Sequence, residues 1–176
     1  LMHGISRLGV VFTLIAHFAD THVGAKLYGF EWSLEVLLEH FRSAVEEALR
    51  EGVNAIVFSG DLFDKPRPSN RALKTVIEVV RRAVDRGVRV YSILGEHDFP
   101  KVPDIPPQHL IPGLLVPFGD EVFLDCFRVS GVEYCISGVN HVPIKYGGGL
   151  KRKLLSSIIN AASKTGWRGA LMLHQN

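Results

Sequence analysis

Three apolar runs of the chain are each followed at once by a cluster of acidic and imidazole side chains. The runs cover residues 10–18, 53–59 and 88–94. Each is short and ends at turn-forming residues, which predicts a buried strand. Loops at the carboxyl ends of strands are where α/β proteins usually build their ligand sites. We therefore expect the three clusters to meet at one edge of a sheet.

Two segments between these strands carry apolar side chains at helical spacing. Residues 31–51 repeat them three and four positions apart, and Gly52 suits the position just after a helix. Ser69 is expected to cap a second helix over residues 70–86. The order strand–helix–strand–helix–strand predicts an α/β fold with a largely parallel sheet.

The second half of the chain predicts a hairpin, a helix and a last strand. The Ser-Gly pair at residues 130–131 is a two-residue turn signal between strands expected over 121–127 and 132–136. A further helix is expected over about residues 150–164 and a strand over 168–174.

The hairpin register would place Cys126 opposite Cys135, at a pair without mutual hydrogen bonds. Such pairs bring the Cβ atoms to about 4.5–5.5 Å, which is within adjustment of disulfide geometry. Intracellular proteins usually keep thiols reduced, which favours two buried free thiols. A protein from a hyperthermophile would be the exception, and the small number of Gln and Asn residues points weakly that way.

Composition adds bounds on class and location. The 176 residues suit one domain with a sizeable core. A net charge of +2 gives no sign of general nucleic-acid affinity, although a neutral protein can carry a locally basic site. The apolar run at residues 8–19 is too short to span a bilayer, and no cleavage pattern follows it. We expect a soluble cytoplasmic protein of a prokaryotic cell, with no membrane partner.

The first two clusters contain residue types that divalent metals prefer. Asp20 and His22 stand two apart, so in an extended segment both side chains point to one side and can ligate one ion. Asp61 follows Gly60, which allows a tight turn beside a metal, and its two oxygens can bridge two ions. Each pattern alone is equally typical of a cap or a turn. Together they indicate a divalent metal site.

The third cluster and the end of the chain add further candidates. Glu96 is a candidate ligand, His97 a candidate ligand or acid, and Asp98 is expected to cap or orient the loop. His174 ends an apolar strand, and this position favours a functional role over a core or surface one. His17 lies in the first strand and is interpreted as a hydrogen-bonded core residue. The other histidines are interpreted as structural or surface residues; they are His3, His40, His109 and His141.

Several strings around these residues are specific enough to indicate a family. The short motifs are Asp20-x-His22, Gly60-Asp61-x-x-Asp64, Gly95-x-His97-Asp98 and Leu-His174-Gln. They resemble the calcineurin-like metallophosphoesterases. The longer strings at residues 17–24 and 60–69 are similar to the double-strand-break repair nucleases of the meiotic-recombination-eleven and SbcD family. The resemblance spans residues 11–175.

The resemblance implies a mixed β-sandwich flanked by helices, in α-β-β-α layers, with the activity of a metal-dependent DNA nuclease. It also implies DNA, an ABC-type, SMC-like repair ATPase and a second copy of the chain as partners. The family completes its site with a later Gly-His-x-His motif, and no histidine follows His174 here. Residues 1–176 are therefore expected to form a nuclease domain that is incomplete at its C-terminal end.

The resemblance also assigns roles around two divalent ions, expected to be manganese. The roles it implies are Asp20 and His22 at one ion, Asp61 bridging both, Glu96 and His174 at the other, and His97 as the catalytic histidine with Asp64 orienting it. The family usually has Asn where this chain has Glu96. Glutamate is longer and charged, so it would add negative charge at the second ion.

Two other functions stay open. One is a small-molecule phosphodiesterase or phosphatase of the same superfamily, which the near-neutral charge permits. The other is a catalytically impaired module for dimerisation and DNA positioning. The helix expected over residues 70–86 carries an apolar set too wide for one face, which either burial in the fold or a helix-bundle homodimer would explain.

Overall fold

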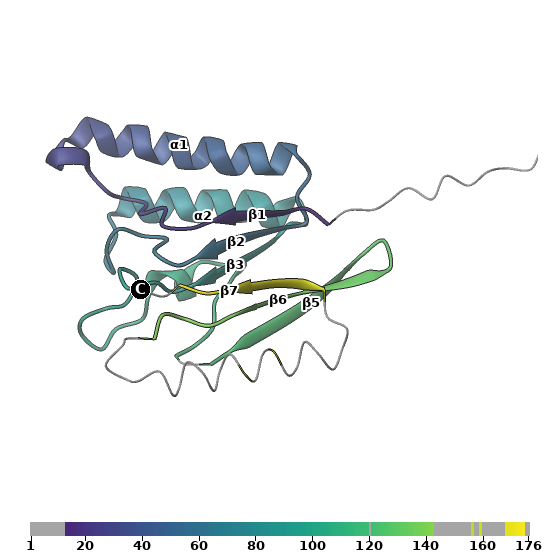
Figure 1. Cartoon of the computed structure of the whole chain (residues 1–176). Helices are drawn as coiled ribbons and strands as arrows, with labels where there is room; N and C mark the ends of the chain where they lie inside the picture. The colour runs from purple at the N-terminus through teal and green to yellow at the C-terminus, as the bar shows by residue number, and fades with distance from the viewer. Residues whose placement is uncertain (1–12, 120, 143–155, 157–158, 160–167, 175–176) are drawn as a thin grey trace, which may run out of the picture.

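A computed structural model of the chain describes residues 13–119, 121–142, 156, 159 and 168–174. Two β-sheets lie face to face, and two long helices cover the outer face of the larger one (Figure 1). The larger sheet is parallel, in the order β1 (Ile15–Phe18), β2 (Ala55–Ser59), β3 (Arg89–Ile93) and β4 (Leu114–Leu115). The smaller sheet has the order β5 (Phe123–Val129), β6 (Val132–Gly138) and β7 (Gly169–Met172).

The two helices begin and end close to their predicted positions. Helix α1 covers Glu31–Arg50 and helix α2 covers Asn70–Asp85. Ser69 caps α2 as expected, because its Oγ accepts a hydrogen bond from the Ala72 N–H at 3.2 Å. Gly52 follows α1 with a φ of +74°, a conformation that glycine adopts without a steric penalty. Two short 3₁₀ helices, η1 (Leu27–Gly29) and η2 (Pro107–Leu110), also form.

The central strand β2 of the larger sheet is buried on both faces. Successive side chains of a strand point to opposite faces. Ile56 and Phe58 therefore pack against α1 and α2, whereas Ala55 and Val57 pack against the smaller sheet. A strand buried on both faces reads as a continuous apolar run, which is the pattern seen in the sequence. Hydrogen bonds from Arg89 and Tyr91 to Asp125 also join the two sheets.

Three of the four predicted layers are present in the described residues: the helices, the parallel sheet and the smaller sheet. This arrangement confirms the α/β fold with a β-sandwich. The helix expected over about residues 150–164 falls almost wholly outside the described residues. In the apolar stretch at residues 109–116, η2 ends and β4 forms, and neither element was predicted.

The hairpin register is confirmed, with Cys126 paired to Cys135 and Val129 to Val132. The preference for free thiols is wrong, because Cys126 and Cys135 form a disulfide. The cross-strand pairing places their Cα atoms 4.0 Å apart, which leaves the sulfur atoms within bonding reach.

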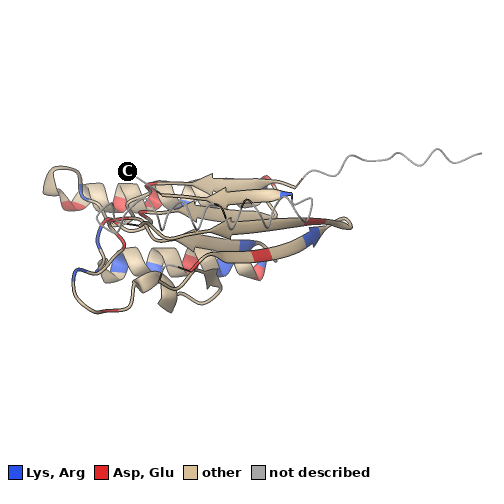
Figure 2. Cartoon of the chain, turned by 60° about the horizontal axis from the view of Figure 1, so that its bottom comes forward, with Lys and Arg blue, Asp and Glu red and all other residues tan. Residues whose placement is uncertain are grey.

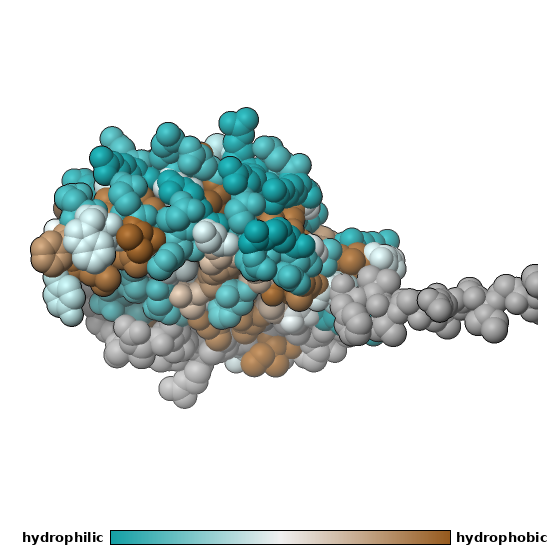
Figure 3. Space-filling view, turned by 90° about the horizontal axis from the view of Figure 1, so that it is seen from above, coloured by the Kyte–Doolittle hydropathy of each residue, from teal (hydrophilic) through white to brown (hydrophobic). Residues whose placement is uncertain are grey.

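The outer surface of the helices is mainly hydrophilic (Figure 3). Apolar side chains gather in this view at the end where α1 begins, and Tyr28, Phe30 and Trp32 of that segment are exposed. Acidic and basic positions both occur on the ribbons of the two helices (Figure 2), with more acidic positions on α1 and more basic positions on α2. Among the helices of the described residues, none has the length and apolar character needed to cross a membrane.

Candidate metal centre

The loops that follow β1 and β2 run side by side. The Asp20 N–H donates to the Gly60 carbonyl oxygen at 3.3 Å, and the His22 N–H donates to the Asp61 oxygen at 3.0 Å. These hydrogen bonds continue the parallel pairing of β1 and β2 beyond the strand ends. The first two clusters of the sequence therefore lie next to each other, as predicted.

Three of the candidate ligands share an unusual backbone conformation. The φ angles of Asp20, His22 and Asp61 are +51°, +42° and +49°, all in the left-handed region. Non-glycine residues rarely adopt this conformation, and such strain persists only where the surrounding structure enforces it. Its concentration at three neighbouring polar residues is typical of a functional site.

The Asp61 carboxylate, on the loop after β2, faces residues of three other loops. Its Oδ1 accepts a hydrogen bond from the His97 N–H at 2.9 Å. Its Oδ2 is 3.5 Å from Nε2 of His174 and 3.9 Å from Nε2 of His22. Asp61 is 5% exposed, so its carboxyl group is buried among side chains that can share a cation with it.

The hydrogen bonds of His174 fix the atom that it presents to Asp61. Its Nδ1 lies 3.0 Å from the Ser59 carbonyl oxygen, and a carbonyl can only accept, so Nδ1 carries the proton. In the neutral ring Nε2 then holds a lone pair, and Nε2 is the atom near Asp61. A carbonyl that fixes the tautomer in this way is a common feature of metal-binding histidines. His174 thus reaches the predicted edge with a ligand atom available.

His97 is held in the same manner from the other side of the site. Its Nδ1 donates to the main-chain oxygen of Asp64 at 3.0 Å. This hydrogen bond raises the pKa of His97, and the nearby carboxylates of Asp61 and Asp64 raise it further, whereas burial opposes the shift. The His97 side chain is exposed, so its Nε2 edge is accessible to a substrate.

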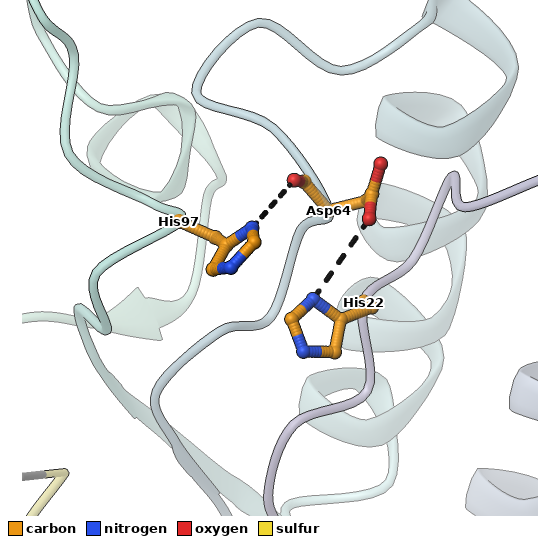
Figure 4. A group of neighbouring side chains, drawn as sticks. All are labelled: His22, Asp64 and His97. Carbon is orange, nitrogen blue, oxygen red and sulfur yellow. Dashed lines mark hydrogen bonds and ion pairs between the residues drawn. The ribbon is translucent and has the colours of Figure 1, made fainter. Parts of the chain in front are cut away.

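Figure 4 shows how Asp64 contacts both histidines. Its carboxylate Oδ1 faces Nδ1 of His22 at 4.0 Å, while its main-chain oxygen holds His97. The group that orients His97 is therefore the carbonyl of Asp64 and not the carboxylate expected from the sequence. The carboxylate is turned toward His22, which leaves it available as a further ligand.

Asp98 orients two of the loops, as predicted. It is fully buried, and its carboxylate accepts hydrogen bonds from the N–H groups of Leu62, Phe63 and Gly95 at 3.3, 3.1 and 2.9 Å. Burial raises the pKa of Asp98, while the hydrogen bonds from Gly95 and Phe63 act against this rise. The contacts tie the turn that carries His97 to the loop that carries Asp61.

The described residues fit divalent ions. Two groups have ligand atoms within 4.8 Å of one another: Asp20, His22 and Asp61 form one, and His22, Asp64 and His97 form the other. Nδ1 of His22 is buried and has no hydrogen-bond partner, which is costly unless an ion or a water satisfies it. Carboxylate oxygens and imidazole nitrogens are suitable ligands for manganese and zinc. Glu96 lies on the same turn as His97, but it is exposed and belongs to neither group.

One histidine beside the site was not singled out by the sequence. His141 is 8% exposed, and its Nδ1 lies 3.3 Å from the His174 carbonyl oxygen. The two rings meet edge to face, with centroids 6.2 Å apart. His141 comes shortly after the end of β6, and the sequence carries no local signal for its contact with His174. The hydrogen bond expected for His17 is present, to Ser59 Oγ at 3.0 Å, but the core interpretation is wrong because His17 is exposed on an edge strand.

Comparison with known proteins agrees with this geometry. The family model described as calcineurin-like phosphoesterase matches residues 13–170. The chain belongs to the calcineurin-like phosphoesterase family. The resemblance drawn from the short motifs is thus confirmed. Proteins of this family use divalent metals, in agreement with the ligand groups around Asp61.

The curated relatives of this phosphoesterase include archaeal repair proteins. DNA double-strand break repair protein Mre11 of Saccharolobus solfataricus is 31% identical over 163 residues, which are 92% of this chain and 40% of that protein. The protein of the same name from Aeropyrum pernix is 41% identical over 90 residues, 51% of this chain and 22% of its own length. The chain therefore spans less than half the length of these relatives.

A solved structure is also similar to this phosphoesterase. The Pseudomonas putida nuclease MPE matches with a TM-score of 0.45 and 20% identity, over 73% of this chain and 54% of that one.

Proposed function

We propose that this chain forms the nuclease domain of a metal-dependent phosphodiesterase that acts on DNA in double-strand break repair. The observation that carries the proposal is the meeting of three strand-end loops around the buried Asp61 carboxylate. The similarity to archaeal proteins named for DNA double-strand break repair supports DNA as the substrate. As an enzyme of this kind it would act in the cytoplasm of a prokaryotic cell.

In this proposal the site holds two divalent ions, with Mn²⁺ as the preferred metal. The assigned ligands are Asp20 and His22 at one ion, Asp61 between both, and Glu96 and His174 at the other. Bound ions of this type supply Lewis acidity toward the phosphate and activate water as a nucleophile. The group of Asp20, His22 and Asp61 and the unpartnered Nδ1 of His22 support the first ion. The second is supported by Nε2 of His174, which lies 3.5 Å from Asp61 Oδ2.

His97 is assigned as the catalytic histidine. The Asp64 carbonyl keeps the proton of His97 on Nδ1 and fixes the ring. Nε2 is then the atom that would donate a hydrogen bond or a proton to the leaving sugar oxygen. Asp61 also receives the main-chain N–H of His97, so the ring and the central carboxylate are positioned together.

The proposed partners are DNA, an ABC-type, SMC-like repair ATPase and a second copy of the chain. Helix α2 supports the homodimer. Its buried side chains face the larger sheet, but Leu73 and Ile77 are only partly buried and Val84 is 40% exposed. These three residues follow one stripe of the helix, and a neighbouring helix of a second copy would cover them.

Replacement of His97 tests the nuclease assignment. We expect His97→Ala in the whole protein to lower Mn²⁺-dependent cleavage of linear duplex DNA by about 10²–10⁴-fold, the usual contribution of a general acid. DNA binding and the thermal unfolding midpoint should be retained. His40→Ala is the matched control, because His40 is exposed on α1 and is outside both ligand groups. Full cleavage by the His97 variant would refute the assignment.

A small-molecule phosphodiesterase is the second candidate. An open groove of about 540 Å³ follows the turn of His97, and its lining, which includes Phe99, Ile105 and Phe118, is mainly apolar. Such a groove suits an apolar leaving group. Turnover of bis(p-nitrophenyl) phosphate with no cleavage of any DNA would favour this candidate over the nuclease.

A further inference from the structure

The segment that follows β6 lies against the end of β3. Asn140 is 1% exposed, and its Oδ1 accepts a hydrogen bond from the Leu94 N–H at 2.8 Å. The His141 N–H donates in turn to the Leu94 carbonyl oxygen at 2.8 Å. Both main-chain groups of Leu94 are thus held by two consecutive residues of the smaller sheet's loop. Leu94 directly precedes the turn that carries His97, so these bonds set the starting point of that turn.

Asn140 is itself fixed by the rest of the fold. Its Nδ2 donates to the carbonyl oxygens of Pro117 and Gly119, each at 3.0 Å. The three hydrogen bonds of this buried side-chain amide are thus all made to main-chain groups. A buried amide that is satisfied in this way favours a single arrangement of the segments around it.

His141 reaches the other part of the site. Its Nδ1 donates to the His174 carbonyl oxygen at 3.3 Å, and its ring packs edge to face on the His174 ring. His174 is therefore held at its main chain by His141 and at its ring by Ser59. The ring is further confined by Gly60, where a Cβ would overlap it.

We propose that Asn140 and His141 form a clamp that fixes the His97 turn and the His174 loop relative to each other, with His141 as a positioning residue for the ion held by His174. The clamp adds to the Ser59 hydrogen bond in joining two loops, because Asp61 follows a strand of the larger sheet and His174 a strand of the smaller one. A shift between the sheets would change the distance between these two ligands. The inference rests on the metal centre of the proposed function, but not on DNA as its substrate.

Metal binding without DNA tests the clamp. Mn²⁺ binding to the whole protein is measured by titration calorimetry for His141→Phe, which keeps a buried ring and removes the N–H donor. We expect one of the two ions to bind about tenfold more weakly, the lower end of the effect of supporting residues on metal affinity. His174→Ala should affect the same ion, and Asp20→Ala the other. His109→Phe, at a partly buried histidine outside both ligand groups, should leave both affinities unchanged.

Rescue separates the hydrogen bond from simple packing. Asn carries an N–H at the same number of bonds from the main chain as Nδ1 of His, so His141→Asn should recover most of the lost affinity. Unfolding in EDTA checks that each variant folds, and His141→Leu replaces the Phe variant if that one does not. Unchanged affinity in the folded Phe or Leu variant overturns the clamp, as does a folded Asn variant without rescue. The clamp is also overturned if the unaltered protein binds no Mn²⁺.

The same measurements keep the two proposals distinguishable. Weakened Mn²⁺ binding in the His141 variant, in a protein that cleaves no DNA, would support the clamp and refute the nuclease. DNA cleavage by the protein, together with unchanged Mn²⁺ affinity in the His141 variant, would support the nuclease and refute the clamp.

Discussion

At Gly60 the chain combines a left-handed conformation with contact to a candidate ligand. Its φ is +90°, and a Cβ there would overlap the ring of His174. Gly52 has a similar φ of +74°, but no described atom lies within 4 Å of the place its Cβ would occupy. Alanine at Gly52 should therefore show only the cost of the left-handed conformation, whereas alanine at Gly60 should also displace the His174 ring.

We expect Gly60→Ala to weaken Mn²⁺ binding, because the new methyl group pushes His174 away from Asp61. Both alanine variants should lose about 1–2 kcal/mol of unfolding free energy from the left-handed conformation. Gly60→Ala should lose about a further 1–3 kcal/mol from overpacking. Urea unfolding in EDTA gives the stabilities, and calorimetry gives the affinities. Equal Mn²⁺ affinity in the two variants would contradict this account of Gly60.

The residues around Asp61 differ in how far the sequence reveals them. Asp20, Asp61 and His97 each follow a strand of one parallel sheet, and parallel strands end at the same edge, so their meeting was predictable. His141 was not, because β6 reads as half of a hairpin. Its parallel pairing with β7, a segment distant in sequence, leaves no local signal. The hydrogen bond from His97 to the main-chain oxygen of Asp64 was not predictable either, because any residue at position 64 carries this oxygen.

Among the elements, α1 and α2 are joined by ion pairs around Glu46. Its carboxylate accepts hydrogen bonds from Arg82 at 2.5 Å and from Arg86 at 3.3 Å. The Arg82 hydrogen bond lowers the pKa of Glu46, Arg86 adds to this effect, and partial burial opposes it. A carboxyl group whose pKa is lower in the folded state than in the unfolded state stabilises the fold at pH values above its ordinary pKa. That stabilisation is lost as the pH falls through the folded-state pKa.

Glu46→Gln should therefore reduce the acid sensitivity of the fold. The variant is expected to have a lower Tm than the unaltered protein at pH 7, and the difference should narrow toward pH 3, where Glu46 is protonated. Glu39→Gln is the control, because Glu39 contacts Arg42 within α1 and does not join the helices. Calorimetric scans across this range measure the effect. A Tm difference that is constant with pH would rule out the Glu46 contribution.

The β5–β6 hairpin carries a covalent cross-link close to its turn. Cys126 and Cys135 are nine positions apart, a loop for which chain entropy predicts about 2.5 kcal/mol of stabilisation. We expect a Cys126→Ser, Cys135→Ser double variant to lose about this amount in urea unfolding, and the unaltered protein to lose it in reductant. The reductant should leave the double variant unchanged. Two reactive thiols in the denatured, unreduced protein would contradict the disulfide.

The elements themselves were predicted unevenly. The bounds of α1 and α2 were predicted within one residue, because apolar spacing, Ser69 and Gly52 all mark the same ends. Strand β4 has two residues and exists only as a partner of β3, through pairs such as Val90 with Leu114. A strand this short has no periodicity of its own, so tertiary pairing decides it. Helix η2 begins among prolines that read as a loop.

At the scale of the whole molecule, the candidate metal centre spans the junction of the two sheets. Asp61 follows β2 of the larger sheet, and His174 follows β7 of the smaller one. Away from this edge the sheets are joined by apolar packing and by the hydrogen bonds of Arg89 and Tyr91 to Asp125. An ion that binds ligands of both sheets would add a link between them at the open edge.

Metal binding should therefore stabilise the whole fold and not only the loops. A ligand at 100 times its Kd adds about 2.7 kcal/mol to the unfolding free energy, which for a chain of this size corresponds to a rise in Tm of about 5–10 °C. We expect this rise when Mn²⁺ replaces EDTA in a thermal scan. His174→Ala should reduce it, because the variant removes the ligand from the smaller sheet, whereas His109→Phe should retain it. Equal Tm values in Mn²⁺ and EDTA would show that no ion links the sheets at this edge.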